Sequence, residues 1–196
     1  MAKTSYGQAT VVADFTFVTS NDHKALTAQA VCDQFGLAFD RQNIDLVEIQ
    51  ADNGEVIAAD KALQAFETFK RPVAVTDDSW NIPGLNGFPG PYMKYINQWF
   101  KTEDFLRLTK DLKDRRLFMR HIIAYRDSQT EKIFSAEIAC TLLKEIRGTS
   151  QIPHFALVSL DGKRSIAEAE TTSNTSAFAS LPNAWHKFGE WFSSKQ

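Results

Sequence analysis

The pattern of hydrophobic and polar residues predicts alternating strands and helices in the first part of the chain. Residues 10–18 are rich in β-branched and aromatic side chains, which is typical of a strand. Residues 24–35 and 52–70 carry apolar side chains at helical spacing, and Gly36 ends the first of these two predicted helices. Between the helices, residues 44–50 are predicted as a short extended run.

Two adjacent carboxylates follow the next predicted strand. Residues 73–75 form a short β-rich run, and we expect Asp77 and Asp78 at its C-terminal end. The sequence of residues 86–92 is NGFPGPY, and two Gly with two Pro in seven residues restrict the backbone so strongly that we predict one rigid loop. An apolar stripe over residues 92–100 predicts a helix directly after this loop.

The last part of the chain is predicted to contain a long hairpin and a C-terminal helix. The predicted elements are a helix capped by Thr102, strands at residues 117–125 and 132–146 around a turn at 127–130, a strand at 154–160, a loop at 165–180 and a helix that starts at Pro182. The large aromatic residues of that last helix share one face, which either closes the core or meets a partner.

Length and composition bound the class of protein. A chain of 196 residues with 43% hydrophobic and 23% charged residues is typical of a globular protein, and we expect one domain over residues 1–196. The net charge of −2 offers no basic footprint for a nucleic-acid polymer. No uncharged apolar run is long enough to span a bilayer, so we expect no membrane segment and a cytoplasmic location. Cys32 and Cys140 are predicted as buried thiols.

Candidate chemistry begins at the first predicted helix. Residues 19–22 supply capping side chains, and a strand, polar turn and helix in this order direct backbone N–H groups toward an anion such as a phosphate. Lys24 lies in the first helical turn, where the helix dipole disfavours a cation, and a bound anion would remove that conflict. From the residues alone, a solvated surface lysine is the favoured interpretation of Lys24, and most Asp-Asp pairs like Asp77–Asp78 are solvated turn residues.

Two motifs resemble one family. DDS followed by NGFPGPYMKY, and TSNDHK about fifty residues earlier, resemble signature segments of the inosine triphosphatase family, whose members hydrolyse noncanonical purine nucleoside triphosphates. The resemblance covers roughly residues 15–125. It implies an α/β fold with a mixed, twisted sheet flanked by helices, and two lobes with a central cleft. It also implies a homodimer and hydrolysis of a nucleoside triphosphate to the monophosphate and pyrophosphate.

The resemblance implies a role for each matching residue. It places Asp78 as the catalytic residue that orients or deprotonates water. The implied ligands of a Mg²⁺ cofactor are Glu48, Asp77 and Asp78, and the implied substrate-binding residues are Thr19, Asn21, Lys24, Ser79 and Lys94. Glu48 could also be a surface glutamate at the end of the extended run. His121, alone in a predicted strand, is predicted to be structural.

The C-terminal third departs from the family pattern. Family members carry a Gly-Phe-Gly-aromatic-Asp-Pro segment where this chain has residues 150–155, and a Ser-His-Arg motif near residues 174–178, where no His or Arg occurs. Because these motifs recognise the base, the preferred base does not follow from the resemblance. His154 and Phe155 are candidates for stacking on a base, although an aromatic residue in a late strand is more often core. The alternative to an enzyme is a catalytically degenerate homologue that binds nucleotides or a protein partner.

Overall fold

A mixed β-sheet forms the centre of the molecule. The computed structural model describes residues 12–171 and 176–195. The sheet has seven strands in the order β2-β1-β3-β5-β6-β7, and β4 pairs with β3. The strands are β1 (Phe15–Val18), β2 (Phe39–Gln42), β3 (Val73–Asn81), β4 (Pro89–Gly90), β5 (Arg116–Arg126), β6 (Glu131–Leu142) and β7 (Val158–Ser159). β1 runs parallel to β2 and β3, whereas β3, β5, β6 and β7 pair antiparallel.

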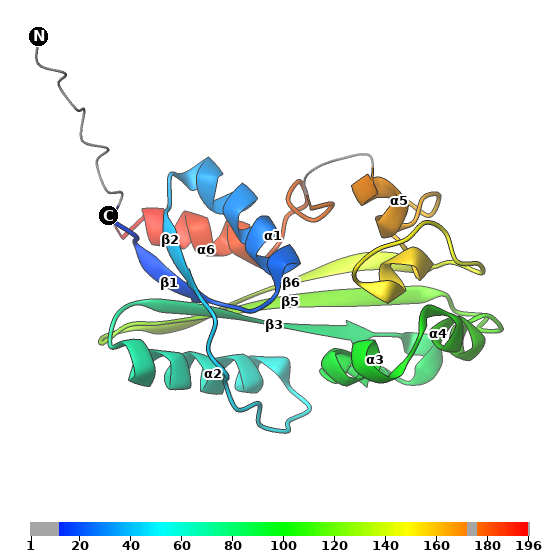
Figure 1. Cartoon of the computed structure of the whole chain (residues 1–196), viewed down its shortest axis with the longest axis horizontal. Helices are drawn as coiled ribbons and strands as arrows, with labels where there is room; N and C mark the ends of the chain where they lie inside the picture. Colours follow the sequence, from blue (N-terminus) through cyan, green and yellow to red (C-terminus); the bar gives the residue numbers. More distant parts are fainter. Residues whose placement is uncertain (1–11, 172–175, 196) are drawn as a thin grey trace, which may run out of the picture.

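Helices cover both faces of this sheet. In Figure 1, α1, α5 and α6 lie on one face, and α2, α3 and α4 lie on the other. The α-helices are α1 (Asp22–Cys32), α2 (Gly54–Phe69), α3 (Met93–Trp99), α4 (Thr102–Thr109), α5 (Ile166–Thr171) and α6 (Ala184–Ser193), and three 3-10 helices span Asp33–Phe35, Pro83–Leu85 and Pro153–Leu157. The predicted α/β fold, a mixed sheet flanked by helices, is confirmed.

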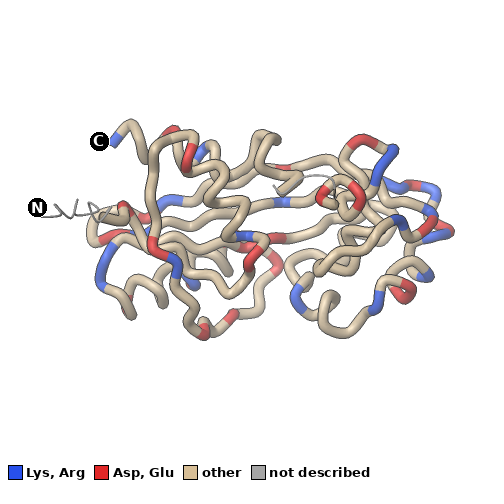
Figure 2. Tube along the Cα trace, turned by 45° about the horizontal axis from the view of Figure 1, so that its top comes forward, with Lys and Arg blue, Asp and Glu red and all other residues tan. Residues whose placement is uncertain are grey.

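The molecule has two lobes that share the long central strands. At one end of the sheet, α1 and α6 pack on one face around Phe17 and Phe188, and α2 packs on the other face through small residues such as Ala58 and Ala62. At the other end, a third core cluster forms around Phe105 between the strands, α3, α4 and the 3-10 helix Pro153–Leu157. Lys, Arg, Asp and Glu are interspersed along the whole trace in Figure 2.

Local sequence explains where several helices begin and end. Asn21 caps α1, since its side chain accepts a hydrogen bond from the backbone N–H of Lys24 at 3.1 Å. Gly36 follows the 3-10 extension of α1 in the left-handed conformation (φ 66°), which glycine adopts without strain. The rigid loop predicted after β3 is present, with positive φ at Asn86, Gly87 and Gly90. The aromatic face of α6 closes the core rather than meeting a partner, as the burial of its large side chains shows.

Three predictions for the later part of the chain were wrong or incomplete, and one strand was missed. Residues 154–160 were predicted as a strand, but they are mainly a 3-10 helix. The prediction failed because a run of buried apolar residues does not distinguish a strand from a helical turn. Residues 165–180 contain the short helix α5. Thr102 is the first residue of α4 and not its cap; instead, the backbone N–H of Lys101 donates to the Asp104 side chain at 3.0 Å. β2 was not predicted.

Residues 44–50 are not a strand of the sheet. Their side chains alternate between half-buried and exposed from Ile44 to Glu48, as in a strand, but no ladder joins them to a neighbour. The prediction that Cys32 and Cys140 are buried thiols is confirmed, since both are free and buried. Among the described residues, no helix has the length and apolar character needed to cross a membrane.

Candidate active site

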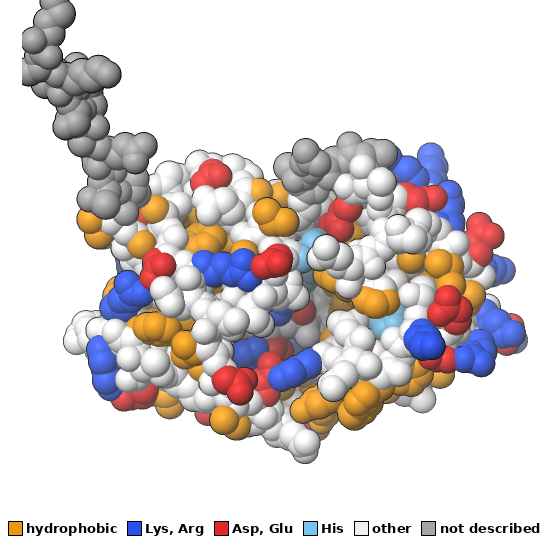
Figure 3. Space-filling model, in the orientation of Figure 1, with side chains coloured by type: hydrophobic (Ala, Val, Ile, Leu, Met, Phe, Trp, Pro, Cys, Tyr) orange, Lys and Arg blue, Asp and Glu red, His pale blue; other side chains and the backbone are white. Residues whose placement is uncertain are grey.

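A cavity of about 450 Å³ lies between the two lobes. Figure 3 shows it as a hollow in the middle of one face, with acidic and basic side chains gathered around it. Its walls come from the N-terminal turn of α1, the middle of β3 and β5, the side of α2 and the start of α3. A volume in this range is typical of small-molecule sites. Segments that are far apart in the sequence therefore meet at one cavity.

The two adjacent aspartates lie in the middle of β3, and the prediction that they end a strand was wrong. β3 pairs with β1 only as far as Val75, which lies opposite Val18, and then continues to Asn81 beside β5. Asp77 and Asp78 thus lie just beyond the end of β1, where the cavity opens. Because successive side chains of a strand point to opposite faces, the two carboxylates have different partners.

Asp78 faces α1 and forms an ion pair with Lys24, at 3.0 Å between Oδ2 and Nζ. Burial alone would lower the pKa of Lys24, but Asp78, with Asp77 and Glu48 farther away, raises it above its usual value. Burial would likewise raise the pKa of Asp78, yet Lys24 and then His121 hold it below its usual value. Both groups are therefore charged at neutral pH, and Lys24 is not a solvated surface lysine.

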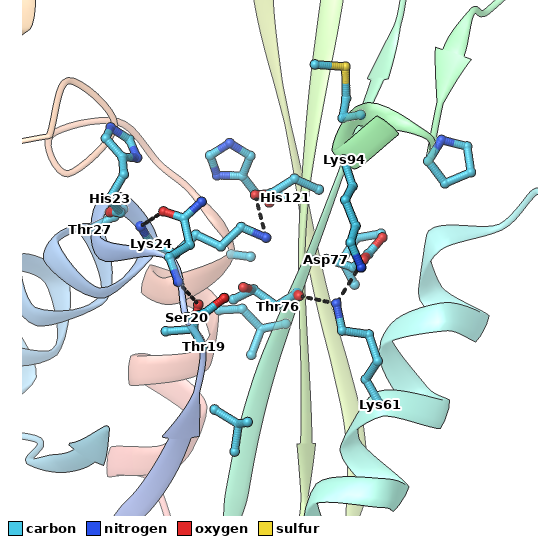
Figure 4. Close-up of a pocket in the computed structure, with 18 of the residues that line it drawn as sticks. Thr19, Ser20, His23, Lys24, Thr27, Lys61, Thr76, Asp77, Lys94 and His121 are labelled. Carbon is cyan, nitrogen blue, oxygen red and sulfur yellow. Dashed lines mark hydrogen bonds and ion pairs between the residues drawn. The ribbon is translucent and has the colours of Figure 1, made fainter. Parts of the chain in front are cut away.

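Asp77 faces α2, where Lys61 joins it to Glu48. The Lys61 Nζ lies 3.3 Å from Asp77 Oδ1 and 3.2 Å from Glu48 Oε1, and it donates to the backbone oxygen of Thr76 at 3.2 Å (Figure 4). Burial raises the pKa of Asp77, against the opposing effect of Lys61 and Lys24. For Glu48, burial raises the pKa, but Lys61 and then Lys94 outweigh it, and the pKa is lowered.

Lys61 was not found by sequence reasoning. It lies on α2 between Ala58 and Ala65, which are fully buried, so its stem borders the packed face of the helix. A lysine beside a buried helical face is a weak signal, because long side chains often cover apolar surface with the charge in water. Here only 12% of the Lys61 side chain is exposed, and its ammonium is held among acceptors instead.

Lys94 reaches the same carboxylates from the other lobe. Its Nζ lies 3.2 Å from Glu48 Oε2, and 62% of its side chain is exposed at the mouth of the cavity. It belongs to α3, which follows the rigid loop after β3. Glu48 therefore receives one lysine from each lobe, and this contact links the two sides of the cavity.

The far end of the cavity is aromatic. His121 lies opposite Asp78 in the pairing of β3 with β5, and its ring centroid is 5.2 Å from that of Phe178. Burial lowers the pKa of His121, against the effect of Asp78. His23 packs edge-on against Phe155 at 5.3 Å between centroids. Both His121 and His23 line the cavity. His121 therefore has more than the structural surroundings predicted for it.

Glu170 holds His23 in place. Its Oε1 lies 2.7 Å from His23 Nε2 and also accepts the backbone N–H of Ala177 at 3.2 Å. His154, in contrast, is fully buried in the core against Phe105, so it does not line the cavity and cannot stack on a bound molecule there.

Most of the predicted site residues meet at the cavity. The lining includes Thr19, Asn21, Lys24, Glu48, Asp77, Asp78 and Lys94. Ser79 is the exception: it lies on β3 but does not line the cavity. Thr19 and Asn21 also shape the turn before α1, because the Thr19 hydroxyl oxygen accepts the N–H of Asn21 at 3.1 Å. Near residues 174–178 this chain departs from the Ser-His-Arg motif of the family. Residues 174 and 175 of that stretch lie outside the described part of the chain.

The charges at this cavity suit a phosphorylated ligand. Lysines from α1, α2 and α3 approach three carboxylates, so an incoming polyanion and a cation could each replace one half of the existing ion pairs. Within residues 12–171 and 176–195, no group of three His, Cys, Asp or Glu side chains is already arranged to hold a metal ion. A divalent cation would therefore share its coordination with other ligands.

Comparison with known proteins decides the family. The Ham1 family profile matches residues 15–179. This chain belongs to the Ham1 family. The Ham1-family chain is 27% identical over 177 residues to a protein from Methanopyrus kandleri named dITP/XTP pyrophosphatase, with 90% of this chain and 94% of the relative covered. It is 25% identical over 178 residues to a protein of the same name from Saccharolobus solfataricus, with 90% and 92% covered.

Solved structures show the same fold. A HAM1 protein from Coxiella burnetii superimposes with a TM-score of 0.74 at 16% identity, over 92% of this chain and 99% of that chain. The Ham1 protein of Staphylococcus aureus gives a TM-score of 0.72 at 16% identity, over 93% and 100%. The predicted membership of an inosine triphosphatase-like family is confirmed, and so is its mixed α/β architecture.

Proposed function

We propose that this Ham1-family chain is a nucleoside triphosphate pyrophosphatase that depends on Mg²⁺. Water attacks the α-phosphorus, and the bond breaks between that phosphorus and the oxygen that bridges it to the β-phosphate. The products are a nucleoside monophosphate and pyrophosphate. The observation that carries this proposal is the convergence of the Lys24–Asp78 pair and the Glu48–Lys61–Asp77 cluster at one cavity. The names of relatives that match nearly end to end support it.

The triphosphate would bind at the lysine-rich end of the cavity. Lys24 at the start of α1 and Lys94 at the start of α3 approach this end from two sides. The positive end of the α1 dipole adds to the attraction for phosphate oxygens. As Lys24 turns from Asp78 toward the phosphates, the Asp78 carboxylate becomes available to orient a water molecule and accept its proton. Before substrate binds, Lys24 holds the pKa of Asp78 below its usual value, so the carboxylate is already ionised in the free protein.

Glu48 and Asp77 would hold the magnesium ion. One oxygen of each already lies within 3.3 Å of a cation, the Lys61 ammonium, and Mg²⁺ prefers carboxylate oxygens. Mg²⁺ usually takes one or two carboxylates and completes its shell with water and substrate phosphates, so this donor set fits the ion. When bound, the ion would neutralise charge that develops on the phosphates. Lys61 would then keep its bond to the backbone oxygen of Thr76.

The base would lie at the aromatic end of the cavity. Phe155 and Phe178 supply flat apolar surface there, and His23 and His121 supply ring nitrogens. If Glu170 is ionised, it can only accept, so His23 Nε2 carries the hydrogen and Nδ1 is left for other partners. None of these four residues carries a carboxylate that could read the edge of a base. We therefore propose a broadened base preference.

A panel of substrates tests the proposal. The purified protein would be incubated with Mg²⁺ and dITP, XTP, ITP, GTP or ATP, and pyrophosphate and monophosphate would be measured separately. Release of both in equal amounts, with less discrimination between oxo- and amino-purines than a dITP/XTP pyrophosphatase shows, is the expected result. A folded wild-type protein that turns over no member of the panel would leave the alternative, a degenerate homologue that only binds.

We also propose a homodimer. The side chains of Tyr92, the N-cap of α3, and Trp99, its last residue, are 40% and 68% exposed. Large exposed aromatic residues are typical of interaction surfaces. Light scattering coupled to size-exclusion chromatography would test this part of the proposal, and a monomer mass at micromolar concentration would refute it.

A further inference from the structure

Glu48 lies on a segment that regular secondary structure does not fix. Residues 43–53 belong to no helix or strand. Ile44 and Leu46 pack partly against the α2 side of the core, but Val47 is 72% exposed and Ile49 is 38% exposed. Apolar burial therefore holds the start of the segment and contributes little at Glu48 itself. Another interaction has to set the position of this carboxylate.

The side chain of Gln64 supplies that interaction. Its Nε2 donates to the Val47 backbone oxygen at 2.8 Å, and its Oε1 accepts the Val47 backbone N–H at 3.0 Å. The amide thus bonds both polar groups of one residue, as a neighbouring strand would. Nε2 also donates to Asp60 Oδ2 at 2.6 Å. Because a carboxylate can only accept, Asp60 fixes which end of the amide is nitrogen.

Gln64 and Lys61 act on consecutive residues of the segment. They are three positions apart on α2, so they lie on the same face of the helix. Lys61 bonds the carboxylate of Glu48, and Gln64 bonds the backbone of the residue before it. The Lys61 contact involves oxygens that a metal would need, whereas the Gln64 contacts involve only backbone atoms. The two hydrogen bonds between the Gln64 amide and the Val47 backbone, here called the Gln64 clamp, therefore persist when the Glu48 side chain exchanges partners.

We propose that Gln64 is a positioning residue that holds Glu48 at the cavity, with its amide oriented by Asp60. The effect on Mg²⁺ rests on the proposed function, but the effect on the position of Glu48 does not. Gln64 does not line the cavity, so its loss acts through Glu48. Partners that orient a metal ligand typically change metal affinity or activity by about 10- to 100-fold. We expect loss of the clamp to raise the Mg²⁺ concentration for half-maximal rate about tenfold, with little change in kcat at saturating Mg²⁺.

The test uses Gln64→Met, which keeps the length and helix propensity of the side chain and removes both hydrogen bonds. Gln29→Met is the matched control, because Gln29 also lies on a helix and bonds an aspartate four positions away, Asp33, but on α1. Circular dichroism and thermal unfolding check that both variants fold. Hydrogen exchange of the Val47 amide and the backbone chemical shifts of Glu48 are then measured by NMR in the free protein.

The expected result is faster exchange of the Val47 amide and a change in the backbone chemical shifts of Glu48 in Gln64→Met alone. The Mg²⁺ dependence of pyrophosphate release should shift in the same variant. Unchanged exchange and unchanged Glu48 chemical shifts would overturn the positioning role. If the wild type releases no pyrophosphate, the proposed function fails, and the two NMR measurements still decide whether Gln64 positions Glu48.

Discussion

Replacing Asp78 by Asn separates the catalytic role of this carboxylate from its structural role. The two side chains have the same shape, so the packing of β3 is retained and only the charge is lost. Asn cannot accept the proton of an attacking water molecule, and positioned acid–base groups contribute about 10²- to 10⁴-fold to rate. We therefore expect Asp78→Asn to lower kcat at least about 100-fold, with a smaller effect on KM.

The same substitution has a calculable effect on stability. The Lys24–Asp78 pair has 3.0 Å between charged atoms, and its side chains are 26% and 31% exposed. Breaking a fully buried pair costs about 3–5 kcal/mol and an exposed pair about 0–1 kcal/mol. An amide oxygen still accepts from Lys24, so we expect a loss of about 1–2 kcal/mol, or about 2–8 °C in Tm for a chain of this length.

The assay measures steady-state pyrophosphate release at saturating Mg²⁺ together with thermal unfolding. Asp111→Asn is the control, because Asp111 is exposed after α4 and does not line the cavity. It should leave both the rate and Tm close to those of the wild type. A rate for Asp78→Asn within twofold of the wild type would refute the assigned role. A 100-fold loss accompanied by a loss of cooperative unfolding would instead show that the substitution damaged the fold.

Three further changes test other parts of the site and the core. Lys61→Met removes the cation between Asp77 and Glu48, so the carboxylates repel; we expect the pKa of Asp77 to rise further and the rate at neutral pH to fall about tenfold or more, as a pH–rate profile would show. Equal profiles for variant and wild type would contradict this. Phe155→Leu keeps apolar bulk but removes a stacking surface worth about 1–3 kcal/mol, so KM should rise about 5-fold or more while kcat holds; an unchanged KM would place the base elsewhere. Burial lowers the pKa of His154, with only the Ile96 backbone opposing it, and neither ring nitrogen makes a well-formed hydrogen bond. As the pH falls, the unfolded chain therefore binds a proton at His154 before the folded protein does. The contribution of neutral His154 to the free energy of unfolding is complete above about pH 6.5, and below this pH the free energy of unfolding falls by up to about 1.4 kcal/mol per pH unit. Urea unfolding at two pH values should show a smaller loss in His154→Phe, and equal losses would refute the assignment.

Local sequence determined most of the helices and the hairpin of this protein. Asn21 and Gly36 mark the two ends of the first helical region because their effects on the backbone need no distant partner. The hairpin of β5 and β6 was predicted for the same reason, since Asp127 accepts the N–H groups of Gln129 and Thr130 within its own turn. The motifs around Lys24 and Asp78 were also sufficient to indicate the family.

Prediction failed where distant contacts override local preference. Residues 154–157 have the composition of a strand, but all four are buried in a core contributed by other elements, and they form a 3-10 helix there. β2 has polar residues and exists because β1 offers it a parallel edge. Residues 44–48 alternate like a strand, yet the backbone of Val47 bonds the side chain of Gln64 rather than a neighbouring strand.

The candidate site shows the same division. The sequence determined which carboxylates and lysines were available, because their chemistry belongs to the residue itself. Only the tertiary structure decided that Lys61 joins Asp77 to Glu48, that His121 lines the cavity and that Ser79 does not. These facts depend on where α2 and β5 pack, and electrostatic contacts of about 3 Å are set by positions in space and not by separation along the chain.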